Sequence, residues 1–490
     1  MFAARAIFSV TRAIFSVAWA IFSVAWAISS AAWAILSAAW ANSPEQCWIG
    51  CDGHAGLGAR GDGARVHREG PRVIFSGVTR AGFQRQRQRS LRPRRSALFL
   101  GSLSGALAAI VALAGLETVG CRSRTPSGLQ GDACSYVSEG FGPAGAVSIK
   151  VEVVAKGLEV PWALAFLPGG AMLVTERPGR IRVVRDGEVS APVASVPIAD
   201  SGEGGLLGLA LHPRFDQNRL FYIYYTADED GETRNRVERW TLAADLRSAA
   251  FERVILRGIP AAKYHDGGRL RVGPDGMLYV GTGDGREPDS SQDPSSLAGK
   301  LLRLTPNGEV PEDNPFSGRP VFLLGIRNTQ GFDFRDPKTL IVTDHGPSGN
   351  TGRSGHDEVT IATAGDNLGW PSTFGCEARQ GYVTPALTWQ EAVPPGGAAL
   401  YTGDAIPEWR GSLIVGTLES KHLHRVLFNE ADPRRIARHE VYLRGDPPNG
   451  FGRLREVVMG PDRELYVTTS NCDGRGSCPE DGDKILRITR

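Results

Sequence analysis

Five polar residues are candidates for chemistry, because each lies beside a predicted strand and none is required by a turn. His265 opens the segment HDGGRLRV, and an imidazole, which titrates near neutral pH, is suited to act as a general base. Arg327 and Asn328 lie in GIRNTQGFDF, where both side chains can donate hydrogen bonds to oxygen atoms. Arg453 and Arg455 are two residues apart, so both guanidinium groups lie on one strand face and can meet one anionic ligand.

The strands that position these residues recur as hairpins from Val147 onward. Alternating apolar residues flank PDG or GG turns, as in WALAFLPGGAMLVTE and GRLRVGPDGMLYVGTGD, and predict antiparallel hairpins. Four further units begin with GLLGLALHPRF, GFDFRDPKTLIVTDHG, ALYTGDAIPEWRGSLIVGTL and LREVVMGPDRELYVTTSN. One such unit cannot bury its apolar face alone, so six units predict an all-β, six-bladed β-propeller over residues 147–490. Propeller loops meet at a central channel, where we expect the five candidates.

Composition agrees with this fold and excludes one class of function. The 490 residues include 61 Gly and 31 Pro, which suit many short strands joined by turns. A net charge of +2 argues against a protein that coats nucleic acid, which normally presents a strongly basic face.

The chain before the repeats has a different character. Residues 1–95 begin with five near-copies of a heptapeptide such as AIFSVAW and continue as a Gly/Arg-rich segment. We interpret this leader as translated repeat DNA upstream of the true start; a membrane-active hairpin is the alternative.

An export signal is predicted over residues 96–121. Three arginines precede the uncharged stretch SALFLGSLSGALAAIVALAGL, and Gly120 stands before Cys121, as in a bacterial lipoprotein signal. The alternative is a single membrane-spanning helix. Either interpretation sends the rest of the chain out of the cytoplasm. We expect a periplasmic protein whose one membrane contact is a lipid anchor at Cys121, followed by a linker over residues 122–146.

The remaining cysteines fit an oxidising compartment. Cys134, Cys376, Cys472 and Cys478 follow the signal and are free to form disulfides in an exported domain. Cys472 and Cys478 enclose DGRGS, a short loop that predicts a local disulfide. No C-x₂-C pair is present among these four, so we do not expect them to bind metal.

Seven segments in order give the globular part a family resemblance. They are PWALAFLPGGAMLVTERPGRI, EGGLLGLALHPRF, HDGGRL, GIRNTQG, DHGP, DNLGWP and RLREVV. With them the chain resembles the soluble dehydrogenases of glucose and other aldoses that depend on pyrroloquinoline quinone (PQQ), also called glucose/sorbosone dehydrogenases. The resemblance covers Val147 to Thr489 and implies a six-bladed propeller, in agreement with the repeat.

The resemblance implies a role for each candidate. His265 matches the general base that takes the proton of the C1 hydroxyl while a hydride passes to the quinone and a lactone forms. Arg327 and Asn328 match a pair that holds PQQ oxygen atoms and stabilises developing negative charge. Arg453 and Arg455 match paired arginines that suit a cofactor with three carboxylates.

The resemblance also implies a metal and reaction partners. Gly346 and Pro347 match main-chain carbonyls that ligate a Ca²⁺ ion bridging to PQQ, and Ca²⁺ accepts such oxygen ligands. The substrate is a small aldose, and an external acceptor, a quinone or a cytochrome, re-oxidises the cofactor.

Several positions depart from the family pattern. Glu203 stands where glucose-specific members have a glutamine near the cofactor, and we expect it to act there as a hydrogen-bonding group. The cofactor-contacting lysine of the fifth blade is replaced by Glu419, with Lys421 two residues on as the candidate contact. Tyr264 precedes the candidate base where glucose-specific members have an aspartate that orients it, and Asp266 follows instead.

Two other classes of function remain open from the sequence. A calcium-dependent lactonase would hold its metal mainly by side-chain carboxylates and Asn and would give the arginine pair no role. A non-catalytic propeller that binds a glycan or a protein would tolerate loss of His265, since a fold alone does not determine function.

Other polar residues have ordinary interpretations. Asp357 and Glu358 either bind a second, structural calcium or pair with arginines. His345, in DHGP, is expected to be structural. His422 and His424 alternate along a predicted strand, and we expect an exposed edge rather than a metal site.

Overall fold

The computed structural model describes residues 133–199, 202–347 and 354–490. The predicted leader, the export signal and Cys121 lie outside these ranges. Within them, no helix combines the length and the apolar character needed to span a membrane.

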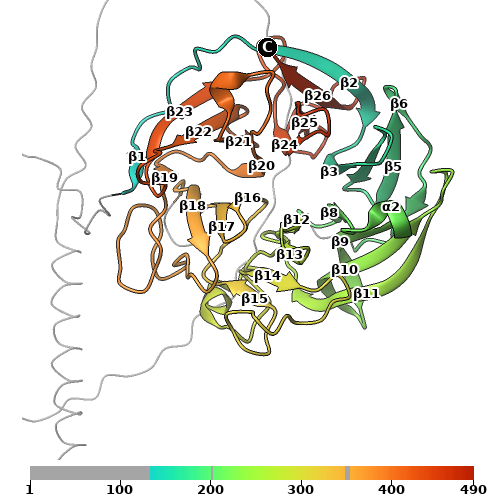
Figure 1. Ribbon diagram of the computed structural model, residues 1–490, viewed down its shortest axis with the longest axis horizontal. Helices are drawn as coiled ribbons and strands as arrows, with labels where there is room; N and C mark the ends of the chain where they lie inside the picture. The colour runs from blue at the N-terminus through green and yellow to red at the C-terminus, as the bar shows by residue number, and fades with distance from the viewer. Residues whose placement is uncertain (1–132, 200–201, 348–353) are drawn as a thin grey trace, which may run out of the picture. The chain divides into compact units, whose positions relative to one another are not determined.

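Six β-sheets surround a central axis, so the predicted six-bladed propeller is confirmed (Figure 1). From the innermost strand outward, the first three blades are β3 (Pro161–Phe166), β4 (Met172–Glu176), β5 (Arg180–Arg185), β6 (Glu188–Val189) and β7 (Ala194–Ser195); β8 (Leu206–Leu211), β9 (Leu220–Glu229), β10 (Glu232–Leu242) and β11 (Ala249–Pro260); and β12 (Leu270–Val272), β13 (Leu278–Gly281), β14 (Leu301–Leu304) and β15 (Val321–Leu323).

The other three blades follow in chain order around the ring. They are β16 (Gly331–Asp336), β17 (Thr339–Asp344), β18 (Glu358–Thr363), β19 (Leu387–Trp389) and β1 (Ser135–Val137); β20 (Pro395–Leu400), β21 (Ser412–Thr417), β22 (Leu423–Phe428) and β23 (Ile436–Tyr442); and β24 (Leu454–Met459), β25 (Leu465–Thr469), β26 (Asp483–Thr489) and β2 (Lys150–Leu158). Short helical turns are α2 (Phe215–Asn218), η1 (Pro288–Gln292) and η2 (Pro407–Trp409).

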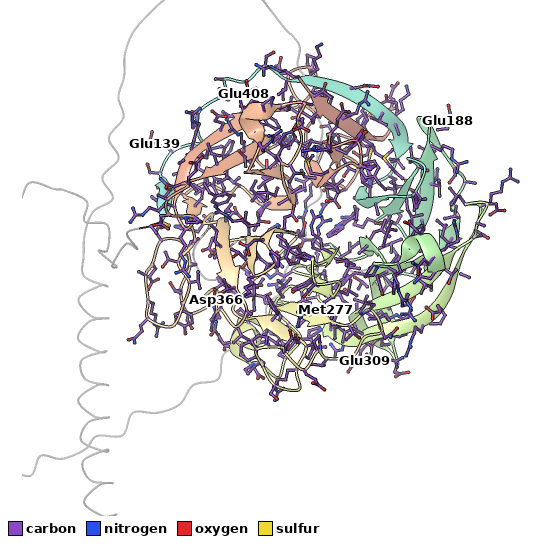
Figure 2. All side chains as sticks on the ribbon, in the orientation of Figure 1. Glu139, Glu188, Met277, Glu309, Asp366 and Glu408 are labelled. Carbon is purple, nitrogen blue, oxygen red and sulfur yellow. A yellow bond between two sulfur atoms is a disulfide. The ribbon has the colours of Figure 1, made fainter. Side chains whose placement is uncertain are left out.

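The core lies between the blades rather than inside any one sheet. The second strand of a blade is covered on both faces, so β9 is a continuous apolar run in which Phe221, Tyr222 and Ile223 are 0% exposed. The outermost strand is covered less, and Phe251 on β11 is 52% exposed. Side chains fill the space between the ribbons, while Glu188 and Glu408 lie on the outer rim (Figure 2).

The ring closes by pairing the two ends of the propeller. Strand β2 pairs antiparallel with β26, with Lys150 opposite Thr489, and so completes the sixth blade with residues from before the first. Strand β1 lies in the segment predicted as a linker and pairs in parallel with β19. A disulfide between Cys134 and Cys376 ties this strand to the fourth blade's last loop.

The expectation of an exposed edge at His422 and His424 is wrong. Both imidazoles are 0% exposed, because the segment 139–145 crosses the blade beside them and Phe141 stacks on His422 with ring centroids 5.2 Å apart. His422 Nε2 lies 3.1 Å from His424 Nδ1, and His424 Nε2 lies 3.3 Å from His439 Nδ1. Each ring is thus a hydrogen-bonded member of a buried row.

Candidate active site

An acidic residue at or just beyond the end of the second strand recurs in four blades. The end of this strand lies beside the start of the antiparallel first strand, so its carboxylate can hold the loop that enters the blade. The residues concerned are Glu176, Asp284, Asp344 and Asp473. Three of the four hold candidate residues from the sequence.

In the third blade, Asp284 orients His265. The Nδ1 atom of His265 lies 2.7 Å from Oδ1 of Asp284, whose Oδ2 accepts a hydrogen bond of 2.9 Å from the indole of Trp370. His265 is 8% exposed and has a positive φ of 70°, uncommon for a residue other than glycine. Gly283 makes the approach possible, since a Cβ there would lie 1.8 Å from the carbonyl oxygen of His265.

The aspartate that follows the base has a different role. Asp266 Oδ1 accepts hydrogen bonds from Asn235 Nδ2 at 3.1 Å and from the N–H of Ala262 at 3.2 Å. Burial raises the pKa of Asp266 to about 7. The structure therefore gives the orienting position to Asp284, which comes from across the hairpin.

In the fourth blade, Asp344 holds the loop that carries Arg327 and Asn328. Its two carboxylate oxygens accept hydrogen bonds from the backbone N–H groups of these residues at 2.8 and 2.7 Å. Burial raises the pKa of Asp344 to about 7. The side-chain oxygen of Asn328 in turn accepts a hydrogen bond of 2.9 Å from the N–H of Gly267, which links this loop to the His265 loop.

His345 joins this network as a neutral imidazole. Burial lowers the pKa of His345 to about 4, so the ring is uncharged at neutral pH. Its Nε2 lies 2.7 Å from the carbonyl oxygen of Pro395, which can only accept, so Nε2 carries the hydrogen. Nδ1 is then the acceptor that faces Asn328 Nδ2 at 3.4 Å.

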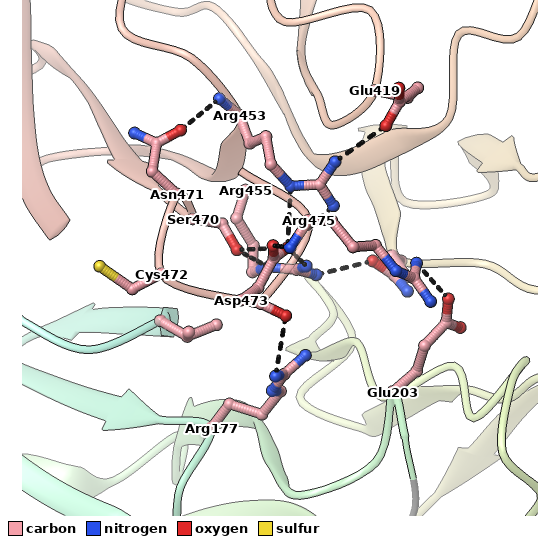
Figure 3. Close-up of polar contacts among 12 residues, drawn as sticks. Arg177, Glu203, Glu419, Arg453, Arg455, Ser470, Asn471, Cys472, Asp473 and Arg475 are labelled. Carbon is pink, nitrogen blue, oxygen red and sulfur yellow. Dashed lines mark hydrogen bonds and ion pairs between the residues drawn. The ribbon is translucent and has the colours of Figure 1, made fainter. Parts of the chain in front are cut away.

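In the sixth blade, Asp473 is the shared partner of Arg453 and Arg455, as Figure 3 shows. Its Oδ2 lies 2.8 Å from an Arg453 nitrogen and 3.5 Å from an Arg455 nitrogen. Both guanidinium groups thus lie on the same side and meet at one protein carboxylate, while the expectation that they bind an anionic ligand stays a prediction. Burial lowers the pKa of Arg455 to about 9.

A disulfide-closed loop delivers Asp473 together with a further arginine. Cys472 and Cys478 are bonded, as predicted, and the loop between them carries Arg475. Arg475 NH1 donates a hydrogen bond of 2.7 Å to Oε1 of Glu203 (Figure 3). The loop thus spans from the sixth blade to the segment that enters the second.

Two adjoining cavities contain most of the predicted site. One of about 250 Å³, the arginine cavity, is lined by residues that include Arg177, Gly346, Pro347, Arg453 and Arg455. The other, of about 370 Å³, is the histidine cavity, lined by Glu203, Tyr264, His265, Arg286, Arg327, Asn328, His345 and Arg475. Glu203, His345 and Arg475 line both, so the cavities share a wall.

Of the two fifth-blade positions considered from the sequence, only one lines a cavity. Lys421 lines neither cavity, and its ammonium group donates a hydrogen bond of 2.8 Å to Asp446. Glu419 does line the arginine cavity, 67% exposed, with Oε2 3.4 Å from Arg453 NH1. The structure therefore brings Glu419, and not Lys421, to the site.

The donor set fits a polyanionic cofactor. Four arginines line the arginine cavity, and guanidinium groups are the natural partners of carboxylates. Arg453 and Arg455 are 2% and 5% exposed, so a carboxylate bound there would be shielded from water.

The main-chain segment Gly346–Pro347 on the same cavity wall fits Ca²⁺, which accepts carbonyl oxygen. The Gly346 N–H donates a hydrogen bond of 3.0 Å to Asp357, which also accepts one of 2.6 Å from Val393. Asp357 thus accepts hydrogen bonds from backbone N–H groups rather than pairing with an arginine. In the described part of the chain, no three His, Cys, Asp or Glu side chains are grouped to hold a metal.

Sequence reasoning missed four residues of the site. Arg177 donates a hydrogen bond of 3.3 Å to the carbonyl oxygen of Asp473, and Asp284, Asp473 and Arg475 have the roles given above. A signal for two of them was present, since Asp473 and Arg475 are charged residues within the predicted disulfide loop. Asp284 and Asp344 also stand in matching places, at or just beyond the ends of the second strands of consecutive units.

Comparisons with known proteins identify the family of this chain. The family model "Glucose / Sorbosone dehydrogenase" matches residues 158–486. The aldose sugar dehydrogenase YliI of Escherichia coli (strain K12) is 34% identical over 358 residues, which cover 68% of this chain and 92% of that protein.

Solved structures give the same result. The PQQ-bound form of aldose sugar dehydrogenase from Streptomyces coelicolor is 35% identical, covers 71% of this chain and 99% of its own, and has a TM-score of 0.62. The apo form of the soluble aldose sugar dehydrogenase from Escherichia coli is 32% identical, covers 70% and 99%, and has a TM-score of 0.60. The chain therefore belongs to the glucose/sorbosone dehydrogenase family and is a homologue of its PQQ-dependent aldose sugar dehydrogenases.

Proposed function

We propose that this protein oxidises aldoses at C1 to the lactone, with PQQ and Ca²⁺ as cofactors and an external quinone or cytochrome as electron acceptor. One observation carries the proposal: the imidazole of His265, held by Asp284, lines a cavity that adjoins a second cavity lined by four arginines. A base and a site for a polyanion are thus side by side, in a family with PQQ-dependent members.

The protein binds and orients both reactants before chemistry. Arg453 and Arg455, together with Arg177, would hold the PQQ carboxylates, while Arg327 and Asn328 would donate hydrogen bonds to other PQQ oxygen atoms. PQQ, when bound, supplies the two-electron acceptor that takes the hydride from C1. Donors held in place before the reaction stabilise the charge that arrives without having to reorganise.

His265 removes the proton from the C1 hydroxyl. The carboxylate of Asp284 can only accept, so Nδ1 of His265 carries the hydrogen and Nε2 keeps its lone pair. That lone pair takes the hydroxyl proton as hydride leaves the same carbon, which converts the C1 carbon to the lactone carbonyl. General base catalysis of this kind contributes roughly 10²–10⁴ in rate.

Gly346 and Pro347 would hold Ca²⁺ through main-chain carbonyls. Asp357 supports this segment by accepting the hydrogen bond from the Gly346 N–H. A hard cation there would act as a Lewis acid toward cofactor oxygen atoms.

We also propose that the propeller works outside the cytoplasm, in the periplasm, with a lipid anchor at Cys121. The two disulfides of the described chain support an oxidising compartment. Labelled palmitate that enters the wild type but not a Cys121→Ala variant would support the anchor; equal labelling of both would refute it.

Titration of the apoprotein with PQQ, followed by aldose-dependent dye reduction, tests the function. Activity that needs both PQQ and Ca²⁺ and collapses in His265→Ala is the expected result. Hydrolysis of lactones that needs Ca²⁺ but no PQQ would instead identify a lactonase. Sugar binding that survives His265→Ala with no turnover would identify a binding module.

A further inference from the structure

The histidine cavity has one positive charge that neither an ion pair nor the proposed cofactor contacts account for. Three arginines line it, Arg286, Arg327 and Arg475, against one carboxylate, Glu203. Glu203 is already paired with Arg475 at 2.7 Å. Arg327 is buried over Trp370, whereas Arg286 is exposed and has no ion pair with any described residue.

The backbone fixes Arg286 relative to the candidate base. Its N–H donates a hydrogen bond of 2.8 Å to Oδ1 of Asp284, the same oxygen that lies 2.7 Å from His265 Nδ1. Arg286 has a φ of 66°, a left-handed conformation that costs a residue with a Cβ about 1 kcal/mol or more. The Arg286 backbone is therefore held by the same carboxylate that orients His265.

Three cations surround one aromatic ring beside this base. The guanidinium carbons of Arg286 and Arg475 lie 5.6 and 5.7 Å from the centroid of the Tyr264 ring, and the ammonium of Lys263 lies 5.5 Å from it. Arg286 lines the histidine cavity and is exposed, so it lies at the solvent-facing rim of that cavity, with the exposed Lys263 close to the same ring. Interaction with the ring face helps to hold the arginine side chains in position.

We propose that Arg286 and Arg475, around Tyr264, form an anion subsite that binds aldoses carrying a carboxylate or a phosphate remote from C1. This inference rests on the proposed function, because it assigns the substrate class of the same cavity. With C1 at His265, the far end of the sugar extends toward the rim, where the Arg286 fork can bind two oxygen atoms of one anion. Uronic acids and aldose 6-phosphates have this chemistry, and neutral hexoses lack it.

The test compares three sugars that differ at C6 alone: D-galactose, D-galacturonate and D-galactose 6-phosphate. Steady-state dye reduction with the purified PQQ- and Ca²⁺-loaded protein gives kcat/KM for each, and calorimetry gives binding of each sugar without turnover. The variant is Arg286→Gln, which removes the charge. Arg257→Gln on β11 is the matched control, because Arg257 is also exposed and lines neither cavity.

We expect at least one anionic sugar to be preferred over galactose, and the preferred one identifies the group bound. Arg286→Gln should lower the ratio of anionic to neutral kcat/KM about tenfold, as expected for one charge-assisted contact, while Arg257→Gln leaves the ratio as in the wild type. The preference should also weaken at high ionic strength, since an exposed cation is screened by salt.

Equal kcat/KM and equal binding for all three sugars would overturn the subsite and leave the proposed function standing. An equal loss for all three in Arg286→Gln would overturn it too, because Arg286 would then act on the base loop instead. If no sugar is oxidised by the loaded protein, the proposed function fails, and calorimetry still decides whether an anion binds at Arg286.

Discussion

Replacing Asp284 with asparagine should disable the base without disturbing the cofactor site. Asp284 serves three donors: His265 Nδ1 at 2.7 Å and the N–H of Arg286 at 2.8 Å through Oδ1, and Trp370 Nε1 at 2.9 Å through Oδ2. An amide has one acceptor oxygen and one NH₂ group, so it cannot satisfy donors on both sides.

Each orientation of the new amide has a definite consequence. If its oxygen faces His265, the NH₂ group faces the indole N–H of Trp370 and the two donors repel. If its NH₂ group faces His265, Nδ1 must become the acceptor, Nε2 takes the hydrogen, and the ring can no longer accept a proton there. Loss of the base predicts a decrease in kcat of about 10²-fold or more.

Steady-state kinetics and PQQ titration together measure this effect. Asp284 lines neither cavity, so Asp284→Asn should bind PQQ with wild-type affinity and change kcat far more than KM. Asp266→Asn is the matched control, because Asp266 adjoins His265 in sequence but binds Asn235 and Ala262. A kcat for Asp284→Asn within about threefold of the wild type would refute the assignment of Asp284 as the positioning residue.

Three further predictions concern charge in the cavities and the core. Asp473→Ala leaves the buried Arg453 and Arg455 without their shared carboxylate, so the free energy of unfolding in urea should decrease by about 3 kcal/mol. Because bound PQQ would supply carboxylates to the same arginines, PQQ should raise Tm more in this variant than in the wild type. Glu419→Lys replaces an exposed negative charge 3.4 Å from Arg453 with a positive one, so calorimetry should show PQQ binding about threefold tighter; weaker binding would contradict the role of the arginine cavity. Burial lowers the pKa of His422 from 6.5 to about 4, so between these pH values the unfolded chain binds a proton at His422 and the folded chain does not. The free energy of unfolding should therefore decrease as pH is lowered from 6.5 to 4, by up to about 3 kcal/mol. His422→Phe should lose that part of the pH dependence, which unfolding at pH 7 and pH 4.5 measures by difference; equal slopes for both proteins would refute it.

The six blades could be predicted because each depends on local signals. A turn such as PDG between two apolar runs determines a hairpin without reference to the rest of the chain. Ring closure could not be predicted in the same way. Strand β2 pairs with β26 more than 300 residues later in the sequence, and nothing within Lys150–Leu158 specifies that partner.

The candidate site, too, could be predicted only in part. Residues that flank inner strands, such as His265 and Arg453, were found from their place in the hairpin repeat. Their partners Asp284 and Asp473 come from the far end of the neighbouring strand, so contact depends on strand pairing rather than on adjacency in sequence. For the same reason Asp266, which follows His265 in the sequence, was the wrong candidate for the orienting carboxylate, since it binds Asn235 instead.

Pre-steady-state reduction of bound PQQ by aldose, without dye, shows whether His265 removes the proton as the aldose is oxidised. His265→Asn suits the comparison, because asparagine tolerates the left-handed backbone at this position. We expect wild-type PQQ occupancy in the variant and a reduction rate lower by about 10²-fold or more. Reduction at the wild-type rate in a variant that binds PQQ fully would contradict it.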